Sequence, residues 1–221
     1  LANEVTLTAY KAAYESLEVG MTQGDFRSLV SQAHSAQGFS GGAGVQVGQY
    51  SALPHGSVTP QDIEEGSILL IDGGCGVEGY RSDISRTFLV GEPTDKMREV
   101  FAIEQRAQQA ALDTAAPGVE AQAVDAAARR VIEEAGYGPD YTYFTHRVGH
   151  GIGMDGHEWP YLVRNNTMPL EPGMTFSDEP GIYIPGEFGV RLEDCMYITE
   201  DGASLFTPPS PSIDDPFGNW S

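Results

Sequence analysis

The chain alternates between segments with a helical repeat of apolar residues and short apolar runs typical of buried strands. Apolar and small residues recur at helical spacing over 3–18. Thr22, with Asp25 three positions later, has the spacing of a capping box and predicts the start of a second helix, which fades near Gly38. The segment 68–90 (ILLIDGGCGVEGYRSDISRTFLV) then predicts strand, turn, strand.

The same order recurs in the second half of the chain. A long helix is predicted over 94–114, Pro117-Gly118 interrupts it, and a further helix is predicted over 119–135. Strands are expected over about 174–179 and 194–199. The halves share no evident local sequence identity, but helix, helix and strand pair occur twice. We therefore predict an α/β domain of two pseudo-twofold related halves, with a functional site at its centre.

Between the second helix and the first strand pair lies a glycine-rich stretch, 38–56 (GFSGGAGVQVGQYSALPHG). It lacks the lysine and the Ser/Thr of a P-loop and the G-x-G-x-x-G spacing of a dinucleotide site. We interpret it as strand and turn, with His55 at its end.

Composition limits the classes of protein that fit. With 221 residues, 40% of them hydrophobic, the chain can form one large domain. It shows neither an 18-residue apolar run nor a signal sequence, so we expect a soluble, cytoplasmic protein. It opens with Leu1 in place of Met, which indicates a processed product or a piece of a longer protein with an additional N-terminal domain.

The formal charge is −20, from 32 acidic and 12 basic residues. Nucleic acids and anionic membranes need clustered cations, so both are excluded as partners. The acidity otherwise fits a well-solvated surface. Two cysteines, Cys75 and Cys195, are too few for a disulfide scaffold, and we expect small core residues in a reducing compartment.

Two acidic pairs carry the candidate chemistry. Asp72 ends the apolar run of the first strand pair, and Asp83 follows a glycine-rich turn; Glu179 and Glu193 occupy the second strand pair. Each residue alone has an ordinary explanation, such as an Asx turn or a surface carboxylate. Four carboxylates in one cleft would repel one another, whereas divalent cations would balance their charge. The pattern therefore predicts a metal site.

The histidines strengthen this prediction. His150 stands among glycines in GHGIGMDGHE (149–158), a context that core packing explains poorly. His146, His157 and His55 also lie in loop-like contexts, while His34 lies on a predicted helix and is interpreted as surface or satisfied core. Oxygen-rich ligation with one imidazole suits Mn, Co, Fe or Zn in an open site.

At this point the chain resembles a known family, the pita-bread metallopeptidases, and within it the Xaa-Pro peptidases, aminopeptidase P and prolidase. The resemblance extends from the first helix to the strand beyond Glu193. Its strongest segments are DGGCGVEGYRSDISRTF, GHGIGMDGHE, EPGIY and VRLED. By this similarity the chain has the pita-bread fold, and five residues hold two divalent ions, with Mn as the first candidate: Asp72, Asp83, His150, Glu179 and Glu193.

The resemblance also implies roles for the neighbouring residues. Glu179 acts as ligand and as general base or acid, and His55 and His157 hydrogen-bond the substrate and stabilise developing charge. His146 lines the proline pocket, and Tyr183 and Arg191 orient the ligands or the carboxylate side of the substrate. The implied reaction is hydrolysis of the bond between an N-terminal residue and proline.

Several alternatives remain open. Arg191 and Glu193 are two residues apart, so a salt bridge on one face of a strand is the simple interpretation of that pair. Asp178 stands where dipeptidases commonly have an apolar residue, and a polar residue there resembles aminopeptidase P. The whole chain could also be a peptide-binding module without catalysis, or another C–N hydrolase of the same fold. The resemblance leaves room for a homodimer.

Overall fold

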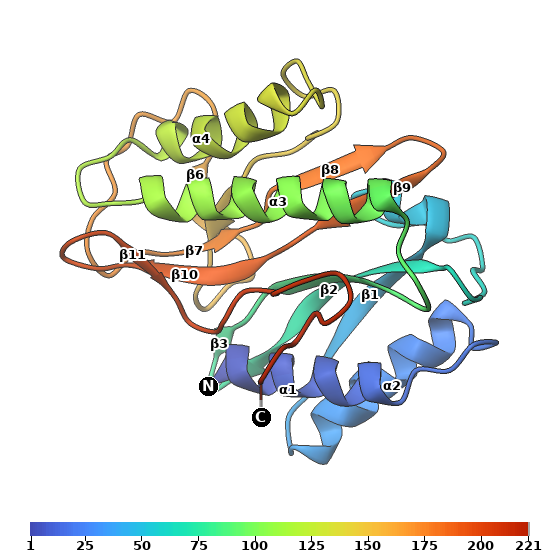
Figure 1. Ribbon diagram of the computed structural model, residues 1–221. Coiled ribbons are helices and arrows are strands. Elements are labelled where there is room, and N and C mark those ends of the chain that lie inside the picture. The colour runs from blue at the N-terminus through green and yellow to red at the C-terminus, as the bar shows by residue number, and fades with distance from the viewer. Residues whose placement is uncertain (221) are drawn as a thin grey trace.

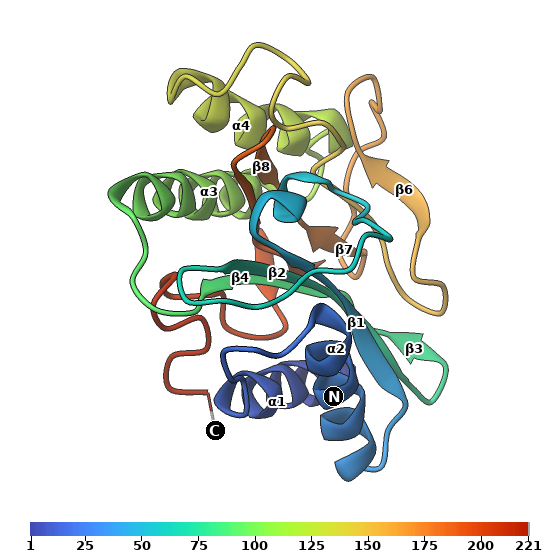
Figure 2. The same cartoon turned by 90° about the vertical axis from the view of Figure 1, so that its right-hand side faces the viewer.

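The computed structural model describes residues 1–220 and arranges them as two helix pairs with sheets between them (Figure 1). One pair is α1 (Ala2–Glu15) and α2 (Gln23–Ala36), and the other is α3 (Asp95–Thr114) and α4 (Ala121–Glu134). A view turned by 90° keeps the pairs on opposite sides, with β2, β4 and β7 between them (Figure 2). No helix within 1–220 combines the length and apolar character needed to cross a membrane.

The helix boundaries follow from local chemistry. The predicted capping box is present: the Thr22 hydroxyl accepts from the Asp25 amide, and the Asp25 carboxylate accepts from the Thr22 amide. The first helix was predicted to reach residue 18 but ends at Glu15. Ser16 leaves helical geometry, and Gly20 then adopts a φ of 95°, which favours glycine.

The first sheet is antiparallel, with β2 at its centre: it comprises β1 (Gly41–Val47), β2 (Ile68–Val77), β3 (Tyr80–Arg81) and β4 (Ile84–Leu89). The glycine-rich stretch forms β1, as predicted, but its remainder differs from the predicted turn. Gly48–Ala52 form a 3-10 helix, which begins where Gly48 takes a φ of 58° and breaks the strand.

The second sheet has the strand order β11-β10-β7-β5-β6. It comprises β5 (Gly149–Gly151), β6 (Glu158–Leu162), β7 (Thr175–Asp178), β10 (Asp194–Ile198) and β11 (Ala203–Leu205). A two-stranded ribbon, β8 (Gly181–Ile184) with β9 (Phe188–Arg191), connects β7 to β10. The predicted strands of the second half are thus present, separated by an additional ribbon.

Side-chain alternation along β2 decides which way its acidic residue points. Leu69 and Ile71 are buried in the cluster that contains α1 and α2, whereas Leu70 is buried against Tyr183 of the other half. Successive side chains of a strand point to opposite faces. Asp72 therefore shares the face of Leu70 and is directed toward the second half.

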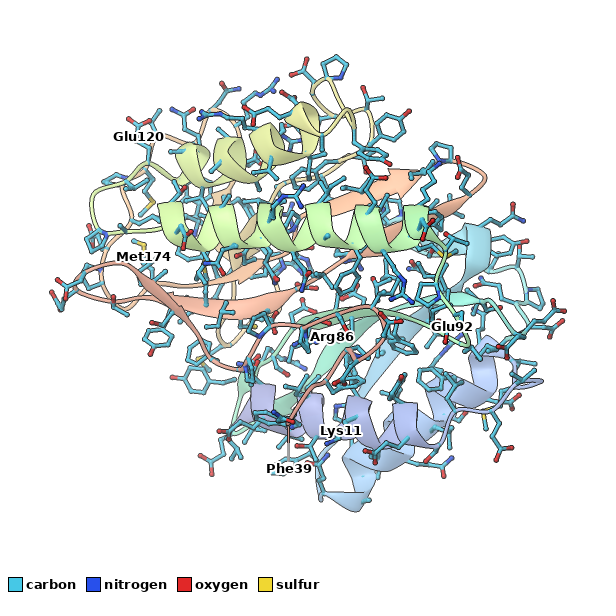
Figure 3. All side chains as sticks on the ribbon, viewed as in Figure 1. Lys11, Phe39, Arg86, Glu92, Glu120 and Met174 are labelled. Carbon is cyan, nitrogen blue, oxygen red and sulfur yellow. The ribbon has the colours of Figure 1, made fainter. Side chains whose placement is uncertain are left out.

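A buried arginine joins the two sheets. Arg86 on β4 lies between the helix pairs (Figure 3) and donates to Asp194 Oδ1 at 2.7 Å. Its other amino group donates to the backbone carbonyls of Ser85 and Glu193, both at 2.9 Å. Ser85 and Glu193 also form an isolated antiparallel bridge. The halves are therefore joined beside the proposed ligands.

Candidate metal centre and active site

The predicted metal ligands come from both halves and converge between them. Their positions are β2 for Asp72, the β3–β4 connection for Asp83, β5 for His150, the residue after β7 for Glu179, and the β9–β10 connection for Glu193. Ligand atoms of Asp83, His150 and Glu193 all lie within 4.8 Å of one another.

The other two carboxylates join this cluster through short contacts. Glu179 Oε1 lies 3.0 Å from His150 Nε2, which is also 3.8 Å from Asp83 Oδ2. Ser85 Oγ lies 3.0 Å from Asp72 Oδ1 and 2.7 Å from Glu193 Oε2. The four carboxylates and the imidazole thus form one continuous site.

The imidazole of His150 is oriented for ligation by its backbone surroundings. Nδ1 donates to the carbonyl of Gly151 at 3.0 Å, so Nε2 faces the carboxylates: there it donates to Glu179 Oε1 when protonated and would offer its lone pair to a cation when neutral. Ser177 Oγ accepts from the backbone amide of His150 and donates to Glu179 Oε1, each at 3.0 Å. Such contacts hold the side chains of His150 and Glu179 in a fixed orientation without a bound cation.

Burial and charge repulsion together raise the pKa values of two of the proposed ligands. Burial, followed by the charges of Asp72 and Glu179, raises the pKa of Asp83 from 3.8 to about 7. Burial, followed by the negative charges of the neighbouring carboxylates, raises the pKa of Glu193 well above its ordinary range. Burial alone would also raise the pKa of Glu179, but its hydrogen bond with His150 and nearby positive charges lower it to about 2. An oxygen-rich, crowded donor set of this kind fits divalent cations.

Arg191 does not form the simple salt bridge with Glu193 that strand spacing favoured. Its Nη2 pairs with Asp72 Oδ2 at 2.7 Å, and its Nε donates to Ser85 Oγ at 3.0 Å. The reason is that β9 ends at Arg191, so Glu193 lies outside the strand and the two residues do not share a strand face. Arg191 therefore orients one proposed ligand directly.

A hydrogen-bonded chain continues from Arg191 to the cavity wall. Arg191 Nη1 donates to Tyr183 Oη at 2.9 Å, and Tyr183 Oη lies 2.7 Å from His146 Nε2. His146 Nδ1 donates to the carbonyl of Arg147 at 2.8 Å, so Nε2 of the neutral ring accepts from the tyrosine. Burial lowers the pKa of His146, which keeps this tautomer uncharged at neutral pH.

A cavity of about 190 Å³ opens onto the proposed ligands. Its lining residues are Pro54, His55, Asp72, His146, Arg147, His157, Glu179 and Arg191. His157 is exposed at this cavity and stacks on His150, with ring centroids 4.0 Å apart. The residues predicted to contact substrate thus surround one cavity, except Tyr183, which lies behind it.

Sequence reasoning did not identify Ser85, Ser177 and Arg147. The two serines had a usable signal, because each lies two residues from a proposed ligand along an extended segment. For Arg147 the sequence offered no signal beyond its position next to His146.

Two other residues lie away from the cavity. His34 is fully buried with Nδ1 bonded to the Val30 carbonyl at 2.8 Å, which matches the satisfied-core alternative. Asp178 is fully buried and is not among the residues that line the cavity, so it gives no support to an aminopeptidase preference.

The chain belongs to the metallopeptidase family M24, whose model matches residues 1–200. It is 44% identical over 219 residues to an Xaa-Pro dipeptidase of Lactobacillus delbrueckii subsp. lactis, covering 96% of this chain and 58% of that protein. It is 40% identical over 209 residues to the Xaa-Pro dipeptidase of Pyrococcus furiosus, covering 93% of this chain and 59% of the relative.

Solved structures confirm the fold. The X-Pro aminopeptidase from Thermotoga maritima superimposes with a TM-score of 0.89 at 36% identity, covering 94% of this chain and 59% of that one. The prolidase from Pyrococcus furiosus gives a TM-score of 0.87 at 39% identity, covering 94% and 61%. The predicted pita-bread fold is therefore confirmed. The chain spans about six-tenths of the length of these relatives.

A divalent cation such as Mn²⁺ is expected to stabilise the protein more at pH 8 than at pH 6. The folded-state pKa of Asp83 is raised above its ordinary value of 3.8 to about 7, so the cation-free protein loses stability as pH rises between these values. Below pH 7 a cation must displace the proton on Asp83, which weakens its binding by up to about tenfold per pH unit.

Thermal denaturation with and without Mn²⁺ at the two pH values measures this effect. The Asp83→Asn variant should show a smaller rise in midpoint and a weaker dependence on pH. An equal rise at pH 6 and pH 8 in the unmodified protein would contradict the assigned role of Asp83.

Proposed function

We propose that this chain is a metal-dependent peptidase domain that hydrolyses the bond between an N-terminal residue and proline. The observation that carries the proposal is the convergence of four carboxylates and His150 beside a cavity lined by His55, His146 and His157. The names of the relatives support the same substrate class. The proposal treats 1–221 as one catalytic domain.

The donor set supports two divalent ions, held by Asp72, Asp83, His150, Glu179 and Glu193. When bound, such ions would polarise the peptide carbonyl and lower the pKa of water. Mn²⁺ is the first candidate because oxygen ligands outnumber nitrogen and thiolates are absent from the ligand set. Both cysteines are buried and free, and neither is a proposed ligand.

The chain's own residues divide the remaining tasks. Glu179 holds a negative charge at neutral pH and takes up or returns the proton of the attacking water. His157 and His55 stand at the cavity wall, where they donate hydrogen bonds to the substrate as its carbonyl gains charge. His146, held in place by its hydrogen bond with Tyr183 behind it, lines the cavity where a proline ring can pack. Proline has no N–H, so such a site needs no acceptor there.

The alternatives from sequence stay distinguishable by experiment. A peptide-binding module would bind Xaa-Pro peptides without cleaving them, whether or not metal is added. Another C–N hydrolase of this fold would cleave N-acyl or amidine compounds in preference to Xaa-Pro. A homodimer or an additional N-terminal domain would complete the cavity from outside this chain, as its partial coverage of its relatives allows.

The protein loaded with Mn²⁺ is expected to cleave Ala-Pro, and a chelator should abolish the activity until Mn²⁺ is restored. Chromatography of the products measures both the reaction and its preference: Ala and Pro from Ala-Pro, Ala and Pro-Ala from Ala-Pro-Ala, and the acid and amine from an N-acyl amide. Binding without cleavage, with the metal shown to be present, would contradict the proposal and favour the binding module.

A further inference from the structure

The proposed ligand Asp83 is carried by a short connection. It lies in the two-residue segment Ser82-Asp83 between β3 and β4. The closest ion-pair partner of its carboxylate within residues 1–220 is Nε2 of His150 at 3.8 Å, which is too long for a hydrogen bond. The direction of the Asp83 side chain therefore depends on how the backbone around it is held.

A tyrosine of α1 and the β9–β10 connection hold that backbone from opposite sides. Tyr10 Oη donates to the carbonyl of Ile84 at 3.1 Å. The N–H of the same peptide group, which belongs to Ser85, donates to the carbonyl of Glu193 at 3.3 Å. This peptide group, one residue beyond Asp83, is thus bonded on both sides, and its two partners come from different halves of the molecule.

Thr6 supports the other side of Asp83 from the same face of α1. Residues four apart on a helix are neighbours on its surface, so Thr6 and Tyr10 face the β3–β4 connection together. Thr6 Oγ1 lies 2.9 Å from Ser82 Oγ, which also accepts from the backbone amide of Cys75 at 3.0 Å. Helix α1 therefore contacts the residue before Asp83 and the residue after it.

The hydroxyl of Tyr10 carries a cost that a phenylalanine would avoid. Tyr10 is fully buried, and a buried hydroxyl destabilises a fold unless it is hydrogen-bonded. Burial, followed by the negative charges of three proposed ligands, raises the pKa of Tyr10 well above its ordinary range, so the phenol keeps its proton. The hydroxyl is thus a permanent donor close to the proposed metal centre.

We propose that Tyr10 is a positioning residue of the metal centre, whose hydroxyl fixes the backbone at Ile84 and thereby the direction of the Asp83 carboxylate. This inference rests on the proposed function, because it takes Asp83 to be a metal ligand. A ligand that is free to turn away must be ordered when the cation binds, so contacts that hold it in place raise the affinity for the cation. Helix α1 is then part of the metal centre although none of its residues lines the cavity.

The test compares Tyr10→Phe with the unmodified protein by calorimetric titration with Mn²⁺ at pH 8. The variant keeps the ring and loses one hydrogen bond, so Mn²⁺ should bind about 3- to 10-fold more weakly. Tyr14→Phe is the matched control and should leave the Mn²⁺ affinity unchanged. Tyr14 lies on the same helix, its ring packs against Phe88 and Phe217, and its hydroxyl forms no hydrogen bond within residues 1–220.

A merely structural role would lower the free energy of unfolding of Tyr10→Phe and leave its Mn²⁺ affinity unchanged, and that result would overturn the inference. Hydrogen exchange of the metal-free protein gives a readout that needs no cation. The amides of Ser82 and Ser85, which donate to the carbonyls of Cys75 and Glu193, should exchange faster in Tyr10→Phe by a larger factor than the amides of α4 in the other half.

Failure of the proposed function is seen separately, as absence of Mn²⁺ binding by the unmodified protein. The exchange rates then decide the inference alone. It stands if the acceleration is confined to Ser82 and Ser85, and it is overturned if α4 accelerates equally, since the lost bond would then have weakened the whole fold.

Discussion

Replacing Glu179 by glutamine is expected to lower kcat for an Xaa-Pro dipeptide by about 10²- to 10⁴-fold while the fold is retained. The amide keeps the shape of the side chain and can still accept from His150 or Ser177, as Glu179 Oε1 does at 3.0 Å from each. It carries no charge, so it cannot take up a proton and is a poor ligand for a cation. The substitution should therefore lower kcat without unfolding the protein.

Steady-state rates with Ala-Pro, together with circular dichroism and metal analysis, measure this prediction. Glu187→Gln is the control, since Glu187 lies at the surface in an exposed pair with Lys96. Turnover within twofold of the unmodified protein, at equal metal content, would remove Glu179 from the reaction and with it the present assignment of roles.

Replacing Arg86 by methionine is expected to destabilise the protein by about 3–5 kcal/mol, since removal of one partner leaves a buried charge uncompensated. Both members of the Arg86–Asp194 pair are fully buried. Without the guanidinium, Asp194 keeps only the hydrogen bond from Gln108 at 3.0 Å. The carbonyls of Ser85 and Glu193 also lose their donor.

Urea denaturation of Arg86→Met measures the loss of free energy of unfolding. Arg98→Met is the matched control, because Arg98 pairs with Glu92 and Asp214 at the surface and exposed pairs contribute about 0–1 kcal/mol. The double variant Arg86→Met/Asp194→Leu should regain part of the stability, since it removes both charges. A loss below about 1 kcal/mol for Arg86→Met would show that the pair does not hold the halves together.

Much of the fold could be predicted because its signals are local. The capping box at Thr22, the helical repeat of the long third helix and the apolar run that ends at Asp72 each depend on neighbours a few residues away. The 3-10 helix at Gly48–Ala52 could not, because glycine permits several backbone paths there and the choice depends on packing. Ser51 Oγ, for example, accepts from the backbone amide of Gly189 on β9.

The proposed ligands could be named from sequence because two acidic pairs and a histidine among glycines occur in one chain, and resemblance then grouped them. Their supporting contacts could not be named in the same way. The partner of Arg191 is Asp72, more than a hundred positions earlier, and spacing along the chain had favoured Glu193. Likewise nothing near Arg147 in sequence shows that Tyr161 lies beneath it. Contacts of this kind appear only once strands have paired and the sheets have packed together.

The alternation of side chains along β2 couples the register of the first sheet to the position of Asp72 in the proposed metal site. A slip of one residue against β1 and β4 would turn Asp72 into the apolar layer beneath α1 and α2 and would turn Ile71 toward the proposed metal site. Such a misregistered sheet would bury a carboxylate and remove a proposed ligand, so the same error would destabilise the fold and weaken cation binding. Cation binding by this chain would therefore depend on correct pairing of its first sheet.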